Sequence, residues 1–253
     1  MTEPSDERPD GAEAIRRAAR RELPRRFYKQ AGSRPQGDRH LITLDGKPLR
    51  TPGKAELAVP AERLAEAIAA EWGAQGETID PMSMPLTRLV NSAIDGVKGR
   101  EVEVAADAAR YAGSDLTCYR ATYPDGLIAR QRQHWDPVLA WAERDLGVRL
   151  IPVQGIMYAD QPQQSLARIG ELIAVYPYLP LAALHSITTL MGSVLLALAV
   201  ARRHLSPEAA WEAAHVDEDW QISQWGEDME ARRRRDHRWK EMQAGALVLA
   251  ALA

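Results

Sequence analysis

The side chains best suited to bind metals or to attack substrates are few in this sequence. It holds one cysteine, Cys118, and six histidines, at positions 40, 134, 185, 204, 215 and 237. No two histidines are three or four residues apart, the spacing that places two ligands on one face of a helix. The sequence therefore predicts no metal site. Cys118 can form no disulfide within the chain, and a lone cysteine is most often a small buried apolar residue.

Two histidines could still do chemistry. His134 lies in QHWDP, two residues before Asp136. With Arg130 and Arg132 nearby, this pair could transfer protons in a hydrolase or lyase. Residues two apart on a helix do not face each other, which favours a surface histidine beside a packed tryptophan.

His185 lies in the most apolar segment, where an imidazole is either a ligand or base, or a core residue bonded to a backbone carbonyl.

The glycine motifs of common enzymes are missing from the sequence. No GxGxxG follows a predicted strand, and neither GxxxxGK[ST] nor GxSxG occurs. The chain therefore lacks the glycine cradles that hold dinucleotides and nucleoside triphosphates, and it lacks the turn that exposes a nucleophilic serine. We expect no cofactor, and no pattern of residues identifies a reaction.

A different kind of site is indicated by DEDWQISQWGEDMEARRRRD, residues 217–236. Six acidic residues and two tryptophans precede four consecutive arginines. On a helix, Ile222, Trp225 and Met229 would share one face with Glu218, while Trp220 would point elsewhere and pack on the bundle. Aromatic anchors beside uncompensated acids fit an interface for a partner that carries arginine or lysine. The other interpretation is that both tryptophans are core residues and the acids are solvated.

The four arginines, residues 232–235, are the feature that a nucleic-acid adaptor would use. Four adjacent residues of a helix point in four directions, which predicts a solvated collar. Acids at positions 227, 228, 230 and 236 would neutralise it in part. The net charge of −3 also argues against a surface built for nucleic acid or for anionic membrane.

The first part of the chain has the pattern of a mixed α+β domain. Residues 25–30 could form a short strand. HLITLDGKPLRTP, residues 40–52, predicts a hairpin with its turn at Asp45-Gly46. Residues 56–59 could add a third strand. Pro60 then opens a helix over residues 61–74.

The pattern from Pro85 onward is nearly all helical. Helices are expected from residue 85 to Gly96, over 100–111, from about 127 to Gly147, and over 163–176, 180–204 and 207–252. Pro137 should kink its helix or divide it in two. Ser206 is the expected N-cap of the last helix, which should break near Gly226 or within the arginine run. Residues 116–120 should be extended, and residues 150–158 could be a strand that returns to the first sheet.

Two segments bear on location. Residues 181–201 are long enough to span a membrane, but polar residues at positions 185, 186, 188 and 189 favour a buried helix of a soluble bundle. Residues 1–24, which begin acidic, lack the apolar core of a secretory signal and read as a flexible arm. We therefore expect an intracellular protein without membrane insertion.

Several motifs together resemble one family. WQISQWGEDME follows HVDED and the apolar segment LLALAVARRHLSPEAAW. Earlier in the chain stand RFYKQ, LDGKPLRTP, Glu71-Trp72, MPLTRLVNSAIDGV and GSDLTCYRA. These strings, spread over residues 25–251, resemble the Atp-twelve family of assembly chaperones for the catalytic head of F-type ATP synthase.

The resemblance implies a fold and a function. It implies a small α+β domain over residues 25–84 and a larger orthogonal helical bundle over residues 85–253. Members are non-enzymatic and hold the α subunit of the catalytic head, protecting its interface until it pairs with the β subunit. The family's acidic position maps onto Asp217, Glu218 and Asp219, of which Glu218 is favoured.

The resemblance also bears on further residues and on the cellular location of the protein. Gln221, Trp225 and Gly226 match the motif itself, whereas Trp72 matches the family but is expected to be structural. The acid-rich arm in place of a mitochondrial presequence suggests a bacterial, cytoplasmic member. We expect this protein to be monomeric when free.

Overall fold

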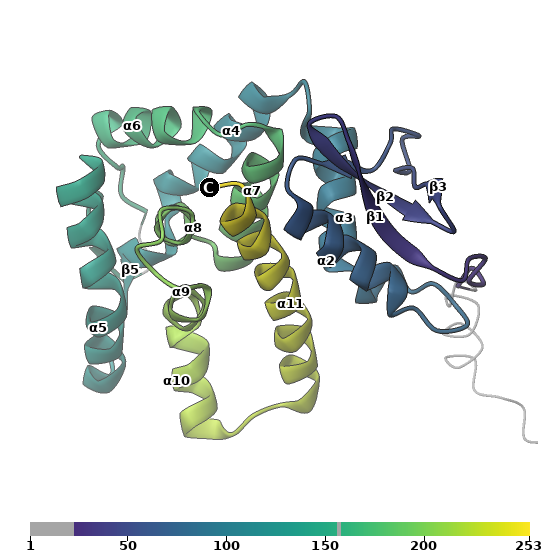
Figure 1. Ribbon diagram of the computed structural model, residues 1–253. Coiled ribbons are helices and arrows are strands. Elements are labelled where there is room, and N and C mark those ends of the chain that lie inside the picture. The colour runs from purple at the N-terminus through teal and green to yellow at the C-terminus, as the bar shows by residue number, and fades with distance from the viewer. Residues whose placement is uncertain (1–22, 156–157) are drawn as a thin grey trace, which may run out of the picture.

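A computed structural model describes residues 23–155 and 158–253. The arm predicted over residues 1–24 therefore lies outside the described residues except for its last two positions. Figure 1 shows a small sheet with helices α2 and α3 at one side of the molecule and a larger group of helices at the other. The α+β class with a helical C-terminal part is confirmed.

The sheet has four short antiparallel strands. They are β1 (Ala31–Gln36), β2 (Arg39–Leu44), β3 (Lys47–Pro48) and β4 (Ala58–Val59), with β2 pairing all three others. The predicted hairpin is confirmed: Leu44 pairs with Lys47 across Asp45 and Gly46, which have φ of 49° and 75°. The strand predicted over residues 25–30 is wrong. Only Arg25 makes an isolated bridge, to Thr78, and the strand begins at Ala31.

Helix α2 (Glu62–Gly73) follows the sheet, within one residue of the prediction at each end. Its buried residues, Leu64, Ala65, Ile68 and Ala69, recur at helical spacing. The helix makes its largest sets of contacts with β1 and β2. One helical face therefore supplies the core beneath the hairpin.

The rest of the chain is almost entirely helical. It contains α3 (Pro85–Ser92), α4 (Glu101–Arg110), α5 (Asp125–Trp141), α6 (Gln163–Ala174), α7 (Tyr178–Met191), α8 (Val194–Ala201), α9 (Pro207–Ala214), α10 (Val216–Trp225) and α11 (Met229–Ala251). Short π-helical turns extend α3 over Ala93–Val97 and α5 over Ala142–Leu146. The α5 extension ends at Gly147 in the left-handed conformation, as expected.

The apolar segment predicted as one helix over residues 180–204 is two helices. Gly192, with φ of 65°, ends α7, and the Ser193 hydroxyl accepts from the Leu196 N–H to cap α8. No helix in the described part of the chain is long and apolar enough to span a membrane. Both helices are buried over most of their length, which confirms the core interpretation of this segment.

Pro137 lies inside α5 without dividing it, so of the two predicted effects the kink stays a prediction. Two other expectations need correction. Residues 116–118 form a 3-10 turn, and only Tyr119–Arg120 is extended, as strand β5. Val153–Gln154, strand β6, pairs in parallel with β5, so this segment stays within the helical part and does not return to the first sheet.

The last predicted helix breaks twice. Gly226 separates α10 from α11, as expected, while the arginine run stays helical. A second break at His215, which was not predicted, separates α9 from α10. Ser206 caps α9 by accepting from the Ala209 N–H.

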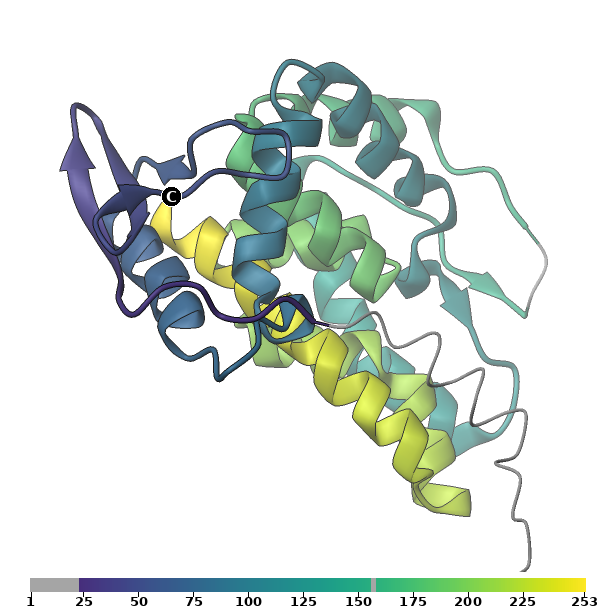
Figure 2. The same ribbon diagram turned by 90° about the vertical axis from the view of Figure 1, so that its right-hand side faces the viewer.

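Helix α11 runs along the molecule from its protruding end towards the sheet side (Figure 2). Its C-terminal half packs on α7, α3, α8 and α2. A single apolar cluster extends from Ile42 in β2 to Leu249 in α11. The boundary between residues 84 and 85 stays a prediction.

Candidate functional site

The base of the candidate site is the joint between α9 and α10. The Nδ1 of His215 lies 2.7 Å from the carbonyl oxygen of Trp211, and the two rings are tilted by 43° to each other with centroids 4.0 Å apart. Burial lowers the pKa of His215 below its ordinary value, so the imidazole is neutral at neutral pH. In this form Nδ1 donates its hydrogen to the Trp211 carbonyl. This contact fixes the direction in which α10 leaves the bundle.

The three neighbouring acids of α10 have different surroundings. The Asp217 carboxylate accepts from Gln131 Nε2 at 2.7 Å, and Gln131 Oε1 accepts from the Ala121 N–H at 2.8 Å. Asp219 forms an ion pair with Arg235 of α11. These two acids therefore hold α10 against α5 and α11.

Asp217 and Glu218 are both exposed, but Glu218 is the acid of the triplet that no side chain of another helix binds among the described residues. Its side chain is 47% exposed, and its one ion-pair contact among the described residues is His215 Nε2 at 3.7 Å. Because that imidazole is neutral at neutral pH, the carboxylate has no charged partner in direct contact among the described residues. Glu218 is thus the member of the triplet best placed to meet a cationic partner.

The end of α10 carries the most exposed aromatic side chain in the described structure. Trp225, the last residue of α10, is 85% exposed, and Met229, the first residue of α11, is 71% exposed. Between them Gly226 takes φ of 84°, a conformation that favours glycine. The expected alignment of Met229 with Ile222 and Trp225 on one helix is therefore wrong. Trp225 and Met229 instead flank the turn between α10 and α11. Figure 1 shows this turn at the protruding end of the molecule.

The second tryptophan of this stretch packs on the bundle, as predicted. The guanidinium carbon of Arg130 lies 5.1 Å from the centre of the Trp220 ring. A Cβ atom built on Gly126 of α5 would lie 2.5 Å from Trp220 Cη2, so the indole sits directly against that backbone. Gln221 is exposed, and its side chain makes no hydrogen bond to any residue that the structure describes.

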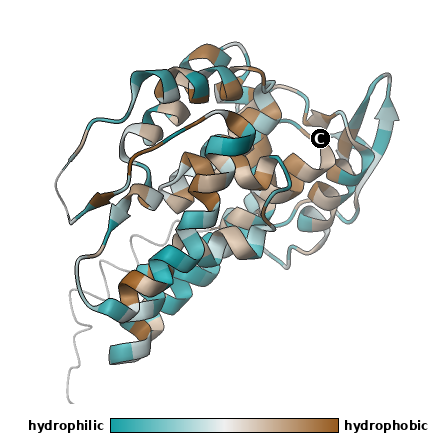
Figure 3. Ribbon diagram, turned by 90° about the vertical axis from the view of Figure 1, so that its left-hand side faces the viewer, coloured by the Kyte–Doolittle hydropathy of each residue, from teal (hydrophilic) through white to brown (hydrophobic). Residues whose placement is uncertain are grey.

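The arginine run forms the predicted collar. Arg232 pairs with Glu227 at 3.3 Å, Arg234 with Glu230 at 2.8 Å, and Arg235 with Asp219. The protruding end of α10 and α11 is mostly hydrophilic in Figure 3. Because neighbouring acids neutralise most of the run, no single basic face forms for a nucleic-acid backbone.

The structure does not bring the proposed enzymatic pair together. Asp136 pairs with Arg120 at 2.8 Å. His134 lines a separate hollow of about 280 Å³, which it shares with Arg130 and Asp219. Burial raises the pKa of the Cys118 thiol to about 12, which leaves it protonated and unreactive at neutral pH.

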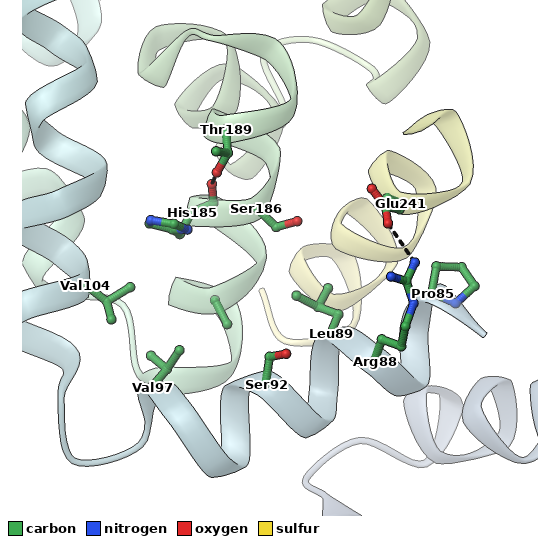
Figure 4. A pocket seen from close by; sticks show the side chains of 11 residues that line it. Pro85, Arg88, Leu89, Ser92, Val97, Val104, His185, Ser186, Thr189 and Glu241 are labelled. Carbon is green, nitrogen blue, oxygen red and sulfur yellow. Dashed lines mark hydrogen bonds and ion pairs between the residues drawn. The ribbon is translucent and has the colours of Figure 1, made fainter. Parts of the chain in front are cut away.

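His185 was predicted to be a ligand or base, or a core residue bonded to a backbone carbonyl. The structure instead shows it partly exposed and bonded to a carboxylate. The side chain is 30% exposed, and Nε2 lies 2.6 Å from the Asp107 carboxylate. It lines a cavity of about 320 Å³, together with the ion pair between Arg88 of α3 and Glu241 of α11 (Figure 4). No group of three or more possible metal-binding side chains occurs in the described residues.

The roles of three acids that hold separate elements together could not be predicted from the sequence. Glu71 accepts from the Leu86 and Thr87 N–H groups at 2.8 and 2.7 Å, which caps the start of α3. Asp115, which is fully buried, accepts from Ser193 Oγ and from the Leu195 N–H at the start of α8. Burial raises the pKa of both Glu71 and Asp115.

The third of these acids joins the sheet to the helices. Asp95 accepts from Thr51 Oγ1 at 2.6 Å and from the Gly53 N–H at 2.8 Å. All three acids lie in strings that carried the family resemblance. Asp115 carries a local signal, because it is the N-cap of the short turn that begins at Leu116. Glu71 and Asp95 bind segments farther along the chain, so no local signal identifies them.

Comparison with known proteins decides the family. A family model described as ATP12 chaperone protein matches residues 25–143. The crystal structure of Atp12 from Paracoccus denitrificans is 37% identical, with a TM-score of 0.83, and the match covers 91% of this chain and 99% of that one. This chain belongs to the ATP12 chaperone family.

Two further relatives extend the comparison across the family. The Atu1473 protein of Agrobacterium tumefaciens is 44% identical, with a TM-score of 0.87, over 98% of this chain and 93% of that chain. The mitochondrial protein atp12 of Schizosaccharomyces pombe is 28% identical over 214 residues, which are 80% of this chain and 74% of that protein. The likeness to the crystal structures thus covers both the sheet and the helices.

Proposed function

We propose that this protein binds the α subunit of the F-type ATP synthase catalytic head and protects its interface until it pairs with the β subunit. The observation that carries the proposal is Trp225, which is 85% exposed at a protruding turn on a chain of the ATP12 chaperone family. Exposed tryptophans are among the most frequent energetic anchors of protein interfaces. The binding face consists of Asp217, Glu218, Asp219, Gln221, Trp225 and Gly226.

The members of this face contribute in different ways. Trp225 supplies apolar area, and the carboxylate of Glu218 favours a client surface that carries arginine or lysine. Asp217 and Asp219 hold α10 in place, through Gln131 and Arg235. Gly226 allows the turn that exposes the indole.

Binding of this kind requires no reaction and no nucleotide. A chaperone that covers an aggregation-prone interface acts by mass action and is displaced when the proper partner binds. We propose that the protein works without a cofactor, as a monomer, in the bacterial cytoplasm.

The test is co-purification of α with the tagged protein from its own host. Glu218→Lys reverses the free carboxylate and Trp225→Ala removes the anchor, so each should reduce recovery of α by about ten-fold or more. Neither change should alter the thermal unfolding temperature, because both side chains face solvent.

Matched controls separate the face from general surface effects. Val102→Ala removes an apolar side chain that is also 85% exposed, but on α4, and Glu62→Lys reverses an exposed acid on α2. Both controls should recover α as the wild type does. Recovery of α that is indifferent to Glu218→Lys and Trp225→Ala would show that the face is not the binding site.

A further inference from the structure

A groove lies beside the candidate face, between α9 and α11, the neighbouring helices labelled in Figure 1. Its volume is about 400 Å³. Trp211 and Trp239 supply its aromatic part, with ring centroids 5.5 Å apart. The remaining lining residues are charged: Glu208, Glu212, Glu227, Arg232, Arg235 and Asp236.

The charges of this groove do not cancel. Its two arginines are engaged, Arg232 with Glu227 and Arg235 with Asp219. The carboxylates of Glu208, Glu212 and Asp236 form no ion pair with any residue that the structure describes. Glu208 and Glu212 are four residues apart on α9 and therefore lie on the same face of that helix. Open carboxylates thus surround an indole-lined hollow.

We propose that this groove receives one arginine side chain of the client, an inference that rests on the proposed function. A guanidinium is flat, so it can stack on an indole while its edge donates paired hydrogen bonds to carboxylates. The groove offers both kinds of surface within one hollow, and its open indole surface comes mainly from Trp239, because Trp211 is buried. Glu227 lies in the turn that follows Trp225, and its partner Arg232 lies in the first turn of α11, so groove and face form one continuous surface.

The groove and the exposed tryptophan then divide the recognition of the client between them. Trp225 covers apolar area, whereas the groove selects for a cation at a fixed distance from that area. A guanidinium between carboxylates in a partly desolvated hollow contributes mainly to specificity, because a neutral side chain there would leave the carboxylates unpaired.

The first experiment tests the groove without the client. The full chain, labelled with nitrogen-15 at the tryptophan indoles, is titrated with Nα-acetyl-arginine amide, and the Trp211 and Trp239 indole resonances are followed by NMR. Nα-acetyl-citrulline amide is the neutral control of nearly equal shape. The proposal expects saturable shifts of both resonances with the arginine compound and much smaller shifts with the citrulline compound.

Two double variants place the binding in the groove. Glu208→Gln with Glu212→Gln should weaken arginine binding by about five-fold or more. Glu62→Gln with Glu66→Gln makes the same charge change on an exposed face of α2 and should leave binding unchanged. Equal shifts with the citrulline compound, or equal binding by the groove variant, would overturn the proposal.

Co-purification of α then separates this inference from the proposed function. Reduced recovery with the groove variant, but not with the α2 variant, supports both. Unchanged recovery with the groove variant overturns the groove and leaves the proposed function standing. If the wild type recovers no α, the proposed function fails. Dimerisation of the wild type that the groove variant abolishes would make a second copy of the chain the occupant, which also overturns the inference.

Discussion

At the residue scale, side chains of the same type take different roles because of what lies opposite them. Asp217 and Asp219 are held by Gln131 and Arg235, while Glu218 between them faces solvent. One turn of helix thus contains two acids that position α10 and one that is available to a partner. Substitution of Asp217 or Asp219 should therefore change the position of α10, whereas substitution of Glu218 should change only the charge that a partner meets.

The pH dependence of stability has a predictable contribution from His215. Burial lowers the pKa of His215 in the folded state, so the unfolded chain binds a proton more readily. As the pH falls below the ordinary histidine pKa of about 6.5, the unfolded chain takes up a proton and the free energy of unfolding decreases. The decrease ends when the pH reaches the lowered pKa of the folded state. His215 therefore contributes stability above that window and loses it on acidification.

The substitution that tests this contribution is His215→Gln. Thermal unfolding is measured at about pH 7.5 and about pH 5.5, on either side of the ordinary histidine pKa. The fall in unfolding temperature between the two should be smaller in the variant, because glutamine does not titrate. His134→Gln, a matched change on α5, should keep the wild-type fall. An unchanged fall in His215→Gln would show that this imidazole is not responsible.

At the element scale, α11 is held in place by close packing on α7. The other end of α11 begins with Met229 of the candidate site. Gly245 of α11 is buried, and a Cβ atom there would lie 2.8 Å from Ile187 Cγ1. Helix propensity favours alanine over glycine by about 1 kcal/mol, whereas overpacking a core costs about 1 to 3 kcal/mol. Steric cost should prevail, because Ile187 is itself fully buried.

We therefore predict that Gly245→Ala lowers the free energy of unfolding by about 1 kcal/mol, measured by urea titration. The control is Gly170→Ala in α6, where a Cβ atom would meet nothing within 4 Å. That change should raise stability by up to about 1 kcal/mol. A stabilised Gly245→Ala variant would mean that α11 and α7 can separate at little cost.

Elements with local signals could be predicted from the sequence. The hairpin at Asp45-Gly46 and the cap at Ser206 depend on residues within a few positions of each other. The break at Gly192 was missed because an almost wholly apolar segment has no periodicity to mark where one helix ends. Strand β1 was missed because two glycines and a proline in and beside AGSRPQ hide its alternation.

The candidate site could be predicted only in part, for a similar reason. The exposed Trp225 and packed Trp220 follow from their spacing on a short helix. The different roles of the three acids could not be predicted from spacing. They depend on Gln131, which is 86 residues from Asp217, and on Arg235 of the next helix.

At the scale of the whole molecule, Asp95 ties the loop between β3 and β4 to the helical part. It accepts hydrogen bonds from Thr51 and Gly53 at 2.6 and 2.8 Å. Asp95→Ala should lower the free energy of unfolding by about 1 to 2 kcal/mol, because hydrogen bonds to a carboxylate are lost and buried Thr51 loses a partner.

Hydrogen exchange locates this effect. In Asp95→Ala, amide exchange should accelerate over residues 49–57, including the Gly53 N–H, and remain unchanged in α10 and α11. Asp95→Asn, which can still accept one of the two bonds, should give an intermediate loss. Equal acceleration throughout the molecule would contradict a local tie.

The most direct test of the central claim is a photo-cross-link from the proposed face. A benzoylphenylalanine replaces Trp225 in one tagged variant and Val102 in another, two positions of equal exposure on different helices. After irradiation in the host, mass spectrometry identifies the attached protein. We predict that the ATP synthase α subunit is attached from position 225 and not from position 102. Cross-links to α from position 102 alone, or from both positions equally, would contradict it.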